Sequence, residues 1–226
     1  MNGSIVNFIA IVAGAAIGLL LRVGISEKTK ETVLQAMGLV VVLIGIKMAL
    51  ASQNALVVVV AMASGSIIGE LLDLEGRLDR FGSWLTVTVG DRYGDAGRGF
   101  VMATLVFCIG AMAIVGSIEE GLRGNPAILY AKSLIDGVCA TVFAASLGIG
   151  VMLSAIPVLL YQGSMTLLAS GLENIVSEAM LAEISGTGGL LILAIGLNML
   201  QITKLKLANF LPSLFMAAVI VYINVL

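Results

Sequence analysis

Apolar runs long enough to cross a membrane recur along the whole chain, with little polar sequence between them. A bilayer core about 30 Å thick takes a helix of roughly 20 residues, and the runs would supply about seven or eight such helices. Only 12% of the 226 residues are charged, whereas a soluble domain averages about 25%. We therefore expect an all-α fold, a single polytopic transmembrane domain over residues 1–226 with no sizeable soluble part.

The composition excludes several classes of protein. The chain has no histidine, so it holds no histidine-based zinc centre or catalytic triad. Cys108 and Cys139 lie within apolar runs and indicate neither a disulfide nor a metal site. With a net charge of -2 and no basic tract, the sequence predicts no nucleic-acid partner. No nucleophile and base pair stands out, so we expect neither an enzyme nor a cofactor.

The apolar runs set the expected helices. One long run is divided where Ser154 precedes Pro157, a pattern typical of a helix stop and restart with a capping hydroxyl. With eight spans, nine lysines and arginines fall on one side and two on the other; seven spans would give seven against four. The positive-inside rule favours eight spans with both termini outside. The expected spans are about 5–21, 33–51, 55–72, 100–116, 133–153, 156–172, 189–200 with its flanks, and 207–226.

The polar segment 73–99 interrupts this pattern. It contains an apolar stripe at helical spacing, with Trp84 beside it and basic residues opposite. This pattern favours a short helix in the cytoplasmic membrane interface, and a solvated loop helix fits it equally well. The stripe consists of Leu74, Leu78, Phe81 and Leu85, and the basic residues are Arg77 and Arg80.

Two segments match closely in hydrophobic register. GLVVVLIGIKM at 38–48 aligns with GLLILAIGLNM at 189–199, which places Gly45 over Gly196. The first three spans, 1–72, would then correspond to the last three, 156–226, and 100–155 would link them. Because the offset is five crossings, the second copy would be inverted, as in many secondary transporters.

Polar and ionisable residues gather between Gly110 and Asp136, where two apolar segments should face each other. Intramembrane charges are costly and are functional candidates by default. A regular helix would carry Glu119 and Glu120 to the outer interface, whereas unwinding at Gly116-Ser117 would place them deeper. Lys132 and Asp136 are spaced i, i+4 and should share one helix face.

A second polar point lies at Tyr161 and Gln162 in LLYQGSM, and Asn7 is a single polar residue in the first span. For Asn7 we expect an interhelical hydrogen bond rather than a ligand contact. The candidate residues for binding a solute or ion are Ser117, Glu119, Glu120, Lys132, Asp136, Tyr161 and Gln162.

Two pairs of glycines are spaced four residues apart, Gly14 with Gly18 and Gly65 with Gly69. Such spacing makes a smooth face on which another helix can approach closely. We expect these four residues to serve helix packing, either within one subunit or across a homodimer.

The stretches GAMAIVGSIEEGL, KSLIDG and SLGIGVMLSAIPVLLYQGS carry a family resemblance. With them the chain resembles, over essentially its whole length, the bacterial inner-membrane family catalogued as domain of unknown function 554, the YqgA-like and YdfK-like proteins. The resemblance implies a multi-pass protein of the bacterial cytoplasmic membrane and implies no activity. The matching signature positions are Gly110, Gly116, Glu119 or Glu120, Gly121, Lys132, Asp136, Gly137, Tyr161, Gln162 and Gly163.

These observations favour a transporter of an ion or of a small cationic or amine-bearing solute. Glu119, Glu120 and Asp136 would form an acidic vestibule, Lys132 an internal counter-ion and Gln162 a neutral ligand. The expected partners are the lipid bilayer, the solute and a second copy of the chain in a homodimer. An ion channel or a non-transporting membrane scaffold or sensor are the alternatives.

Overall fold

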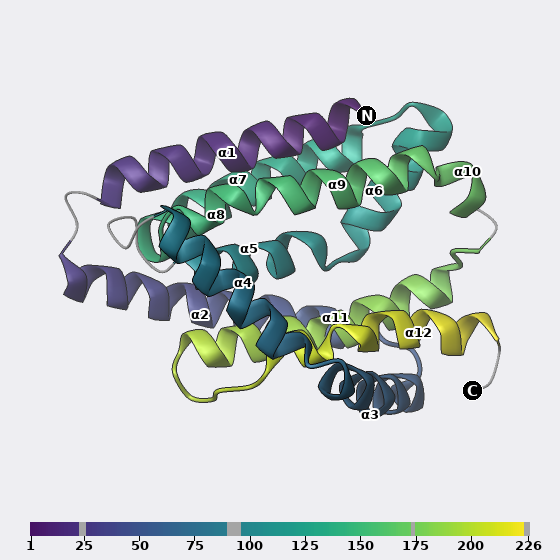
Figure 1. Cartoon of the computed structure of the whole chain (residues 1–226). Helices are drawn as coiled ribbons and strands as arrows, with labels where there is room; N and C mark the ends of the chain where they lie inside the picture. Colours follow the sequence, from purple (N-terminus) through teal and green to yellow (C-terminus); the bar gives the residue numbers. More distant parts are fainter. Residues whose placement is uncertain (23–25, 90–95, 173–174, 224–226) are drawn as a thin grey trace. The chain divides into compact units, whose positions relative to one another are not determined.

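In the computed structural model, the described residues, 1–22, 26–89, 96–172 and 175–223, form helices joined by short connections (Figure 1). Helices suit a bilayer because they satisfy their own backbone hydrogen bonds. This confirms the all-α polytopic class. The helices are α1 Asn2–Arg22, α2 Glu27–Ala49, α3 Ala55–Leu71, α4 Leu74–Val89, α5 Ala96–Cys108, α6 Ala111–Arg123, α7 Ala127–Leu147, α8 Gly150–Leu153, α9 Ala155–Leu167, α10 Ala169–Leu172, α11 Glu178–Met199, the 3-10 helix η2 Leu207–Phe210 and α12 Pro212–Tyr222.

Among the described residues, five helices are long and apolar enough to cross a bilayer alone, and seven crossings result if each of two bent pairs counts as one. The bent pairs are α3 with the start of α4, at 54°, and α5 with α6, at 60°. An eighth crossing would have to use the shorter apolar stretch Leu207–Tyr222. Large apolar side chains are widely exposed, Leu20 at 77% and Leu71 at 81% among them, as expected of a lipid-facing surface.

The helix stops and restarts at Ser154, as predicted: α8 ends at Leu153 and α9 begins at Ala155. The long apolar run also breaks earlier, at Gly148, whose φ of 91° suits glycine. Ser154 caps no backbone N–H, and its hydroxyl donates to the carbonyl oxygen of Val151, so the prediction of a capping serine was wrong. Of the two possibilities for Gly116-Ser117, the structure has the regular helix: α6 runs unbroken through both residues, and the bend comes earlier, between α5 and α6.

Gly116 serves close packing, which explains why the helix does not unwind there. A Cβ added at Gly116 would lie 2.9 Å from Cδ2 of Leu129 on α7. The missing side chain thus lets α6 approach α7, and the backbone conformation stays helical.

The chain divides into two compact units, the first comprising Met1–Gln35, Arg80–Cys108 and Met112–Glu173. In this unit α1 lies along α7, with α9 beside them (Figure 1). A Cβ at Gly14 would lie 2.2 Å from the carbonyl oxygen of Gly137, and one at Gly18 would lie 2.1 Å from that of Thr141. The two helices therefore touch backbone to backbone.

The second unit comprises Ala36–Asp79, Ile109–Ala111 and Asn174–Leu226, and in it α3 packs on α12 and η2. A Cβ at Gly65 would lie 2.3 Å from the backbone nitrogen of Ser213, and one at Gly69 would lie 2.0 Å from the carbonyl oxygen of Asn209. Both glycine pairs thus lie at helix contacts within the chain.

The two segments that match in sequence pack against each other, and they do so reciprocally. A Cβ at Gly45 of α2 would lie 2.8 Å from the carbonyl oxygen of Gly189, and one at Gly189 of α11 would lie 2.7 Å from that of Gly45. Gly38 and Gly196 face each other in the same way, at 3.3 Å and 2.9 Å. Helices α2 and α11 are therefore antiparallel, with equivalent positions exchanging contacts, as in a two-fold interface.

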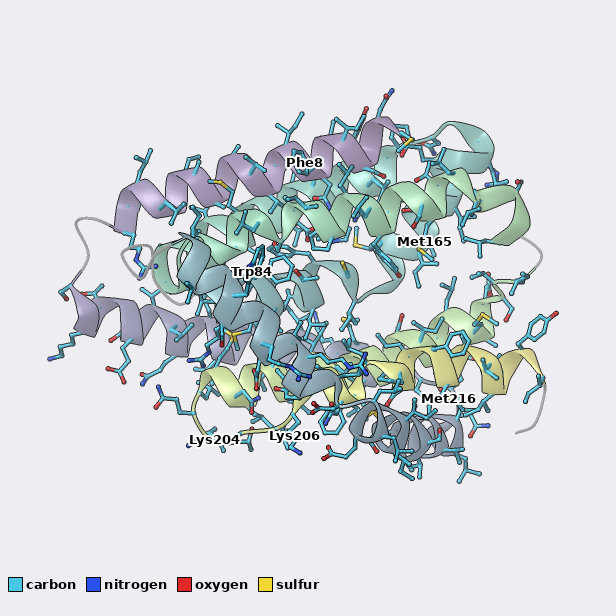
Figure 2. All side chains as sticks on the ribbon, viewed as in Figure 1. Phe8, Trp84, Met165, Lys204, Lys206 and Met216 are labelled. Atoms are coloured by element: carbon cyan, nitrogen blue, oxygen red, sulfur yellow. The ribbon has the colours of Figure 1, made fainter. Side chains whose placement is uncertain are left out.

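Helix α4 carries the predicted apolar stripe in part. Leu74 and Leu78 are half-buried and Arg77 is exposed. Trp84 is 58% exposed (Figure 2), whereas the side chains of Phe81 and Leu85 lie outside the described part of the chain. The location of helix α4 in a membrane interface stays a prediction.

Candidate functional site

An ion pair lies buried near the middle of α7. The ammonium of Lys132 contacts Oδ2 of Asp136, and the two residues are only 6% and 5% exposed. Asp136 is the tenth of the 21 residues of α7, about 14 Å from its start at 1.5 Å per residue. The pair is the one that the i, i+4 spacing predicts.

Asn7 of α1 connects this ion pair to α9. Its side-chain nitrogen Nδ2 donates to Oδ2 of Asp136 at 2.9 Å and to Oε1 of Gln162 at 3.1 Å. Both amide residues are completely buried. Three helices of the first unit thus bring four polar side chains together, which we call the amide–carboxylate cluster: Asn7, Lys132, Asp136 and Gln162.

The cluster retains unused hydrogen-bonding capacity. The acceptor Oδ1 of Asn7 and the donor Nε2 of Gln162 are buried and have no hydrogen-bond partner among the described residues. Leaving a buried polar atom unpaired costs about 1–3 kcal/mol, and buried polar groups are normally satisfied. A free acceptor and a free donor, one on each side of the shared bond, are what a binding site offers to a polar ligand.

A second polar group lies at the start of α1. Oε1 of Glu120 on α6 accepts the backbone N–H of Gly3 at 2.9 Å and lies 3.1 Å from the amino group of Met1. Oε2 of Glu120 and the hydroxyls of Ser4 and Ser117 are buried without a described partner. Helical spacing places Ser4 on the same face of α1 as Asn7, and Ser117 on the same face of α6 as Glu120.

Comparison with known proteins places the chain in a family. The pattern of the family described as "Protein of unknown function (DUF554)" matches residues 2–222. The chain belongs to this family. It is 31% identical over 227 residues to "Uncharacterized membrane protein YdfK" of Bacillus subtilis, covering 99% of this chain and 96% of that one. It is 32% identical over 220 residues to "Uncharacterized protein YqgA" of Escherichia coli, covering 95% and 94%.

No solved structure matches the chain. The likeness to a membrane protein agrees with the apolar helices, and this DUF554 protein is therefore a membrane protein in contact with the lipid bilayer.

The other predicted site residues of this DUF554 protein have no described hydrogen bond or ion pair to the amide–carboxylate cluster. Glu119 pairs with Arg123 at 3.1 Å, and its side chain is 24% exposed. Adjacent residues on a helix point about 100° apart, which is why Glu119 and Glu120 have different partners. Tyr161 lies next to Gln162 and is half-buried. The three carboxylates of the predicted acidic vestibule, Glu119, Glu120 and Asp136, thus each have a different partner.

A buried carboxylate in the second unit was not among the predicted site residues. Glu183 of α11, 3% exposed, accepts the hydroxyl of Ser52 at 2.7 Å and the backbone N–H groups of Gln53 and Asn54 at 2.8 and 2.9 Å. These donors lie at the start of α3, so Glu183 holds the turn between α2 and α3. The one sequence signal for Glu183 is its place as a glutamate just before an apolar run.

A further group of contacts ties α3 and α4 to η2. Glu70 pairs with Lys206 at 2.9 Å and accepts Nδ2 of Asn209 at 2.6 Å. Oδ1 of Asn209 accepts the backbone N–H of Glu75, and Glu75 accepts that of Ala208. Lys206 lies in the connection after α11 (Figure 2), where its hydrogen bond to Glu70 raises the pKa of Lys206. In the described ranges, no three Cys, Asp or Glu side chains are grouped to hold a metal ion.

Proposed function

We propose that this DUF554 protein is a carrier that moves a cation or a small amine-bearing solute across the bacterial inner membrane. The observation that carries the proposal is the amide–carboxylate cluster, in which an ion pair and two amides from three helices are buried around the middle of α7. Charged residues at such depth are costly and mark solute pathways.

The reciprocal contact between α2 and α11 supports the carrier over other membrane proteins. Gly45 contacts Gly189 and Gly38 contacts Gly196, the reciprocal pattern expected where two inverted copies pack together. Secondary transporters built from inverted repeats bind their solute near the bilayer midplane. In this proposal residues 1–72 and 156–226 are the two inverted repeats and 100–155 link them.

The roles follow from the charges. Asp136 attracts the cation, Lys132 neutralises Asp136 in the empty carrier, and Gln162 and Asn7 supply neutral hydrogen-bonding groups. Glu120, with one unpaired oxygen, is a carboxylate further along the route. A homodimer belongs to the proposal as well, with an interface other than the glycine faces, since both glycine pairs contact helices of the same chain.

Flux through purified protein tests the proposal. Proteoliposomes would be loaded with unlabelled sodium, rubidium or methylammonium, and counterflow of the radiolabelled form measured. We expect counterflow for at least one cation, lost in Asp136→Asn and retained in Glu119→Gln. Single-channel currents in a planar bilayer would show a channel instead of a carrier. If the protein gives neither counterflow nor current, the transport proposal is overturned, and the scaffold or sensor remains.

A further inference from the structure

The ammonium of Lys132 occupies the position on Asp136 that a cationic solute would need. Both described donors to Asp136, Nζ of Lys132 and Nδ2 of Asn7, reach the same oxygen, Oδ2. We propose that Lys132 is a tethered stand-in for the substrate, that the substrate is a small primary ammonium ion bearing an acceptor oxygen, and that its binding displaces Lys132 and releases one proton. This inference rests on the proposed function and adds the substrate class and the coupling.

The unpaired atoms of the cluster define the substrate class. An ammonium group has three N–H donors, and the cluster offers it the carboxylate of Asp136 and the unpaired Oδ1 of Asn7. The unpaired Nε2 of Gln162 is a donor and needs an acceptor on the same ligand. Asn7 bonds to both Asp136 and Gln162, so the two ends of the ligand lie within a few ångströms. A short amino alcohol has this arrangement of groups.

The charge balance gives the coupling. Two ammonium groups beside one carboxylate would leave a net positive charge in a buried site, and burial favours neutral lysine. The substrate R–NH3+ therefore binds Asp136 while Lys132 gives up one N–H proton to water and remains as a neutral amine. One cation enters as one proton leaves, so the charge of the site does not change.

The other described groups around Lys132 do not supply the released proton. Asn7 of α1 and Gln162 of α9 are neutral amides, and Asp136 is the carboxylate on its own helix. The thiols of Cys108 on α5 and Cys139 on α7 lie within electrostatic range of the ion pair. Their replacement by alanine should leave the released proton unchanged, which makes the double variant a suitable background.

Two substitutions at Lys132 separate a stand-in from a structural lysine. Lys132→Arg keeps the ion pair but cannot lose its proton, so it should fold and fail to bind the substrate. Lys132→Met removes the ammonium from Asp136, so it should still bind the substrate. A purely structural lysine predicts the reverse, with arginine tolerated and methionine damaging. Lys206→Met is the matched control, because it removes the lysine of an exposed pair with Glu70.

Calorimetric titration of the purified full chain with ethanolammonium measures both quantities. Titrations in two buffers of different ionisation enthalpy give the number of protons released. For the unsubstituted protein and Lys206→Met we expect one proton per ligand and an affinity that rises about tenfold per pH unit between pH 6 and 8. For Lys132→Met we expect ethanolammonium to bind still, and for Lys132→Arg we expect no binding. Ethylammonium, which lacks the oxygen, should bind more weakly, and tetramethylammonium, which has no N–H donor, should not bind.

The outcomes distinguish this inference from the proposed function. Should Lys132→Arg bind ethanolammonium as the unsubstituted protein does, or should binding release no proton, the stand-in is wrong although the carrier stands. Equal binding of tetramethylammonium would overturn the ammonium substrate. If Lys132→Met does not elute from gel filtration as a single peak, Lys132→Arg still tests the stand-in, because arginine retains the positive charge. Counterflow of sodium without any ethanolammonium binding would overturn the stand-in inference and leave the proposed carrier intact. Absence of all counterflow would overturn the proposed carrier.

Discussion

The two units of the chain bury carboxylates in different places along their helices. In the first unit Asp136 lies mid-helix, where backbone groups are already paired, so its partners are side chains of Lys132 and Asn7. In the second unit Glu183 reaches the turn just before α3, where it accepts the backbone N–H groups of Gln53 and Asn54. One carboxylate builds a polar cluster and the other holds a turn.

The unpaired buried atoms differ in the same way. In the described part of the second unit they are hydroxyls, of Ser185, Thr187 and Ser213. In the first unit they also include amide and carboxylate atoms, of Asn7, Gln162 and Glu120. A hydroxyl rotates and can bond a carbonyl of its own helix, whereas an amide or carboxylate has no such local remedy. In the proposed carrier, the first unit would therefore hold the solute and the second would serve as a scaffold.

Both units share one device, the contact of glycine backbones, and substitutions there should have the largest effect. Gly14→Val and Gly65→Val each place atoms where Gly137 or Ser213 already lies. We expect each to cost more than about 3 kcal/mol of stability, seen as loss of a monodisperse peak. Gly171→Ala is the control, since a Cβ there meets nothing within 4 Å. Tolerance at Gly65 alone would show that the second unit is not tightly packed.

The next largest effect should fall on transport. In the proposed carrier, Asp136→Asn removes the charge that binds the cation, and we expect at least about a 100-fold loss of flux, equivalent to about 2.7 kcal/mol. Asparagine has nearly the same size as aspartate and keeps an acceptor oxygen for Asn7, so the folded protein should persist. Flux in proteoliposomes, normalised to protein that elutes as a single peak, measures the change. Unaltered flux would remove the distinction between the two units.

Glu183→Gln should affect stability and not transport. Its carboxylate accepts three hydrogen bonds in the second unit, and bonds to a charged group contribute about 1.5–3 kcal/mol each. Because glutamine retains one acceptor oxygen, we expect a loss of about 2 kcal/mol, read from thermal unfolding. Flux per folded molecule should be unchanged. A fall in flux as large as in Asp136→Asn would mean that the second unit also contributes to the site.

The sequence was sufficient for what depends on local spacing. Helical class, the pairing of Lys132 with Asp136 and the close approach of helices at Gly14 follow from hydrophobic runs and from residues three or four apart. The link from Asn7 to Gln162 spans 155 positions, and nothing in one sequence indicates which of several lone polar residues will meet. The tie between Glu183 and the α2–α3 turn was missed for the same reason.

The break at Gly148 was missed for another reason. Gly116 and Gly148 are both glycines in apolar sequence, yet the first packs against Leu129 and the second turns the chain with a positive φ. Glycine has both uses, and only the neighbouring helix decides between them. Contacts between helices are therefore needed to tell a close approach from a break.

The smallest effects should come from the adjacent glutamates of the first unit. Glu119 forms an exposed i, i+4 pair with Arg123, so Glu119→Gln should cost less than about 0.5 kcal/mol. Glu120 is 6% exposed and accepts the N–H of Gly3, so Glu120→Gln should cost about 1–2 kcal/mol. Thermal unfolding at low and high salt measures both, and the effect at Glu119 should vanish in high salt because exposed pairs are screened. Equal, salt-independent losses would place both carboxylates in one buried environment and restore the single acidic vestibule that the sequence predicts.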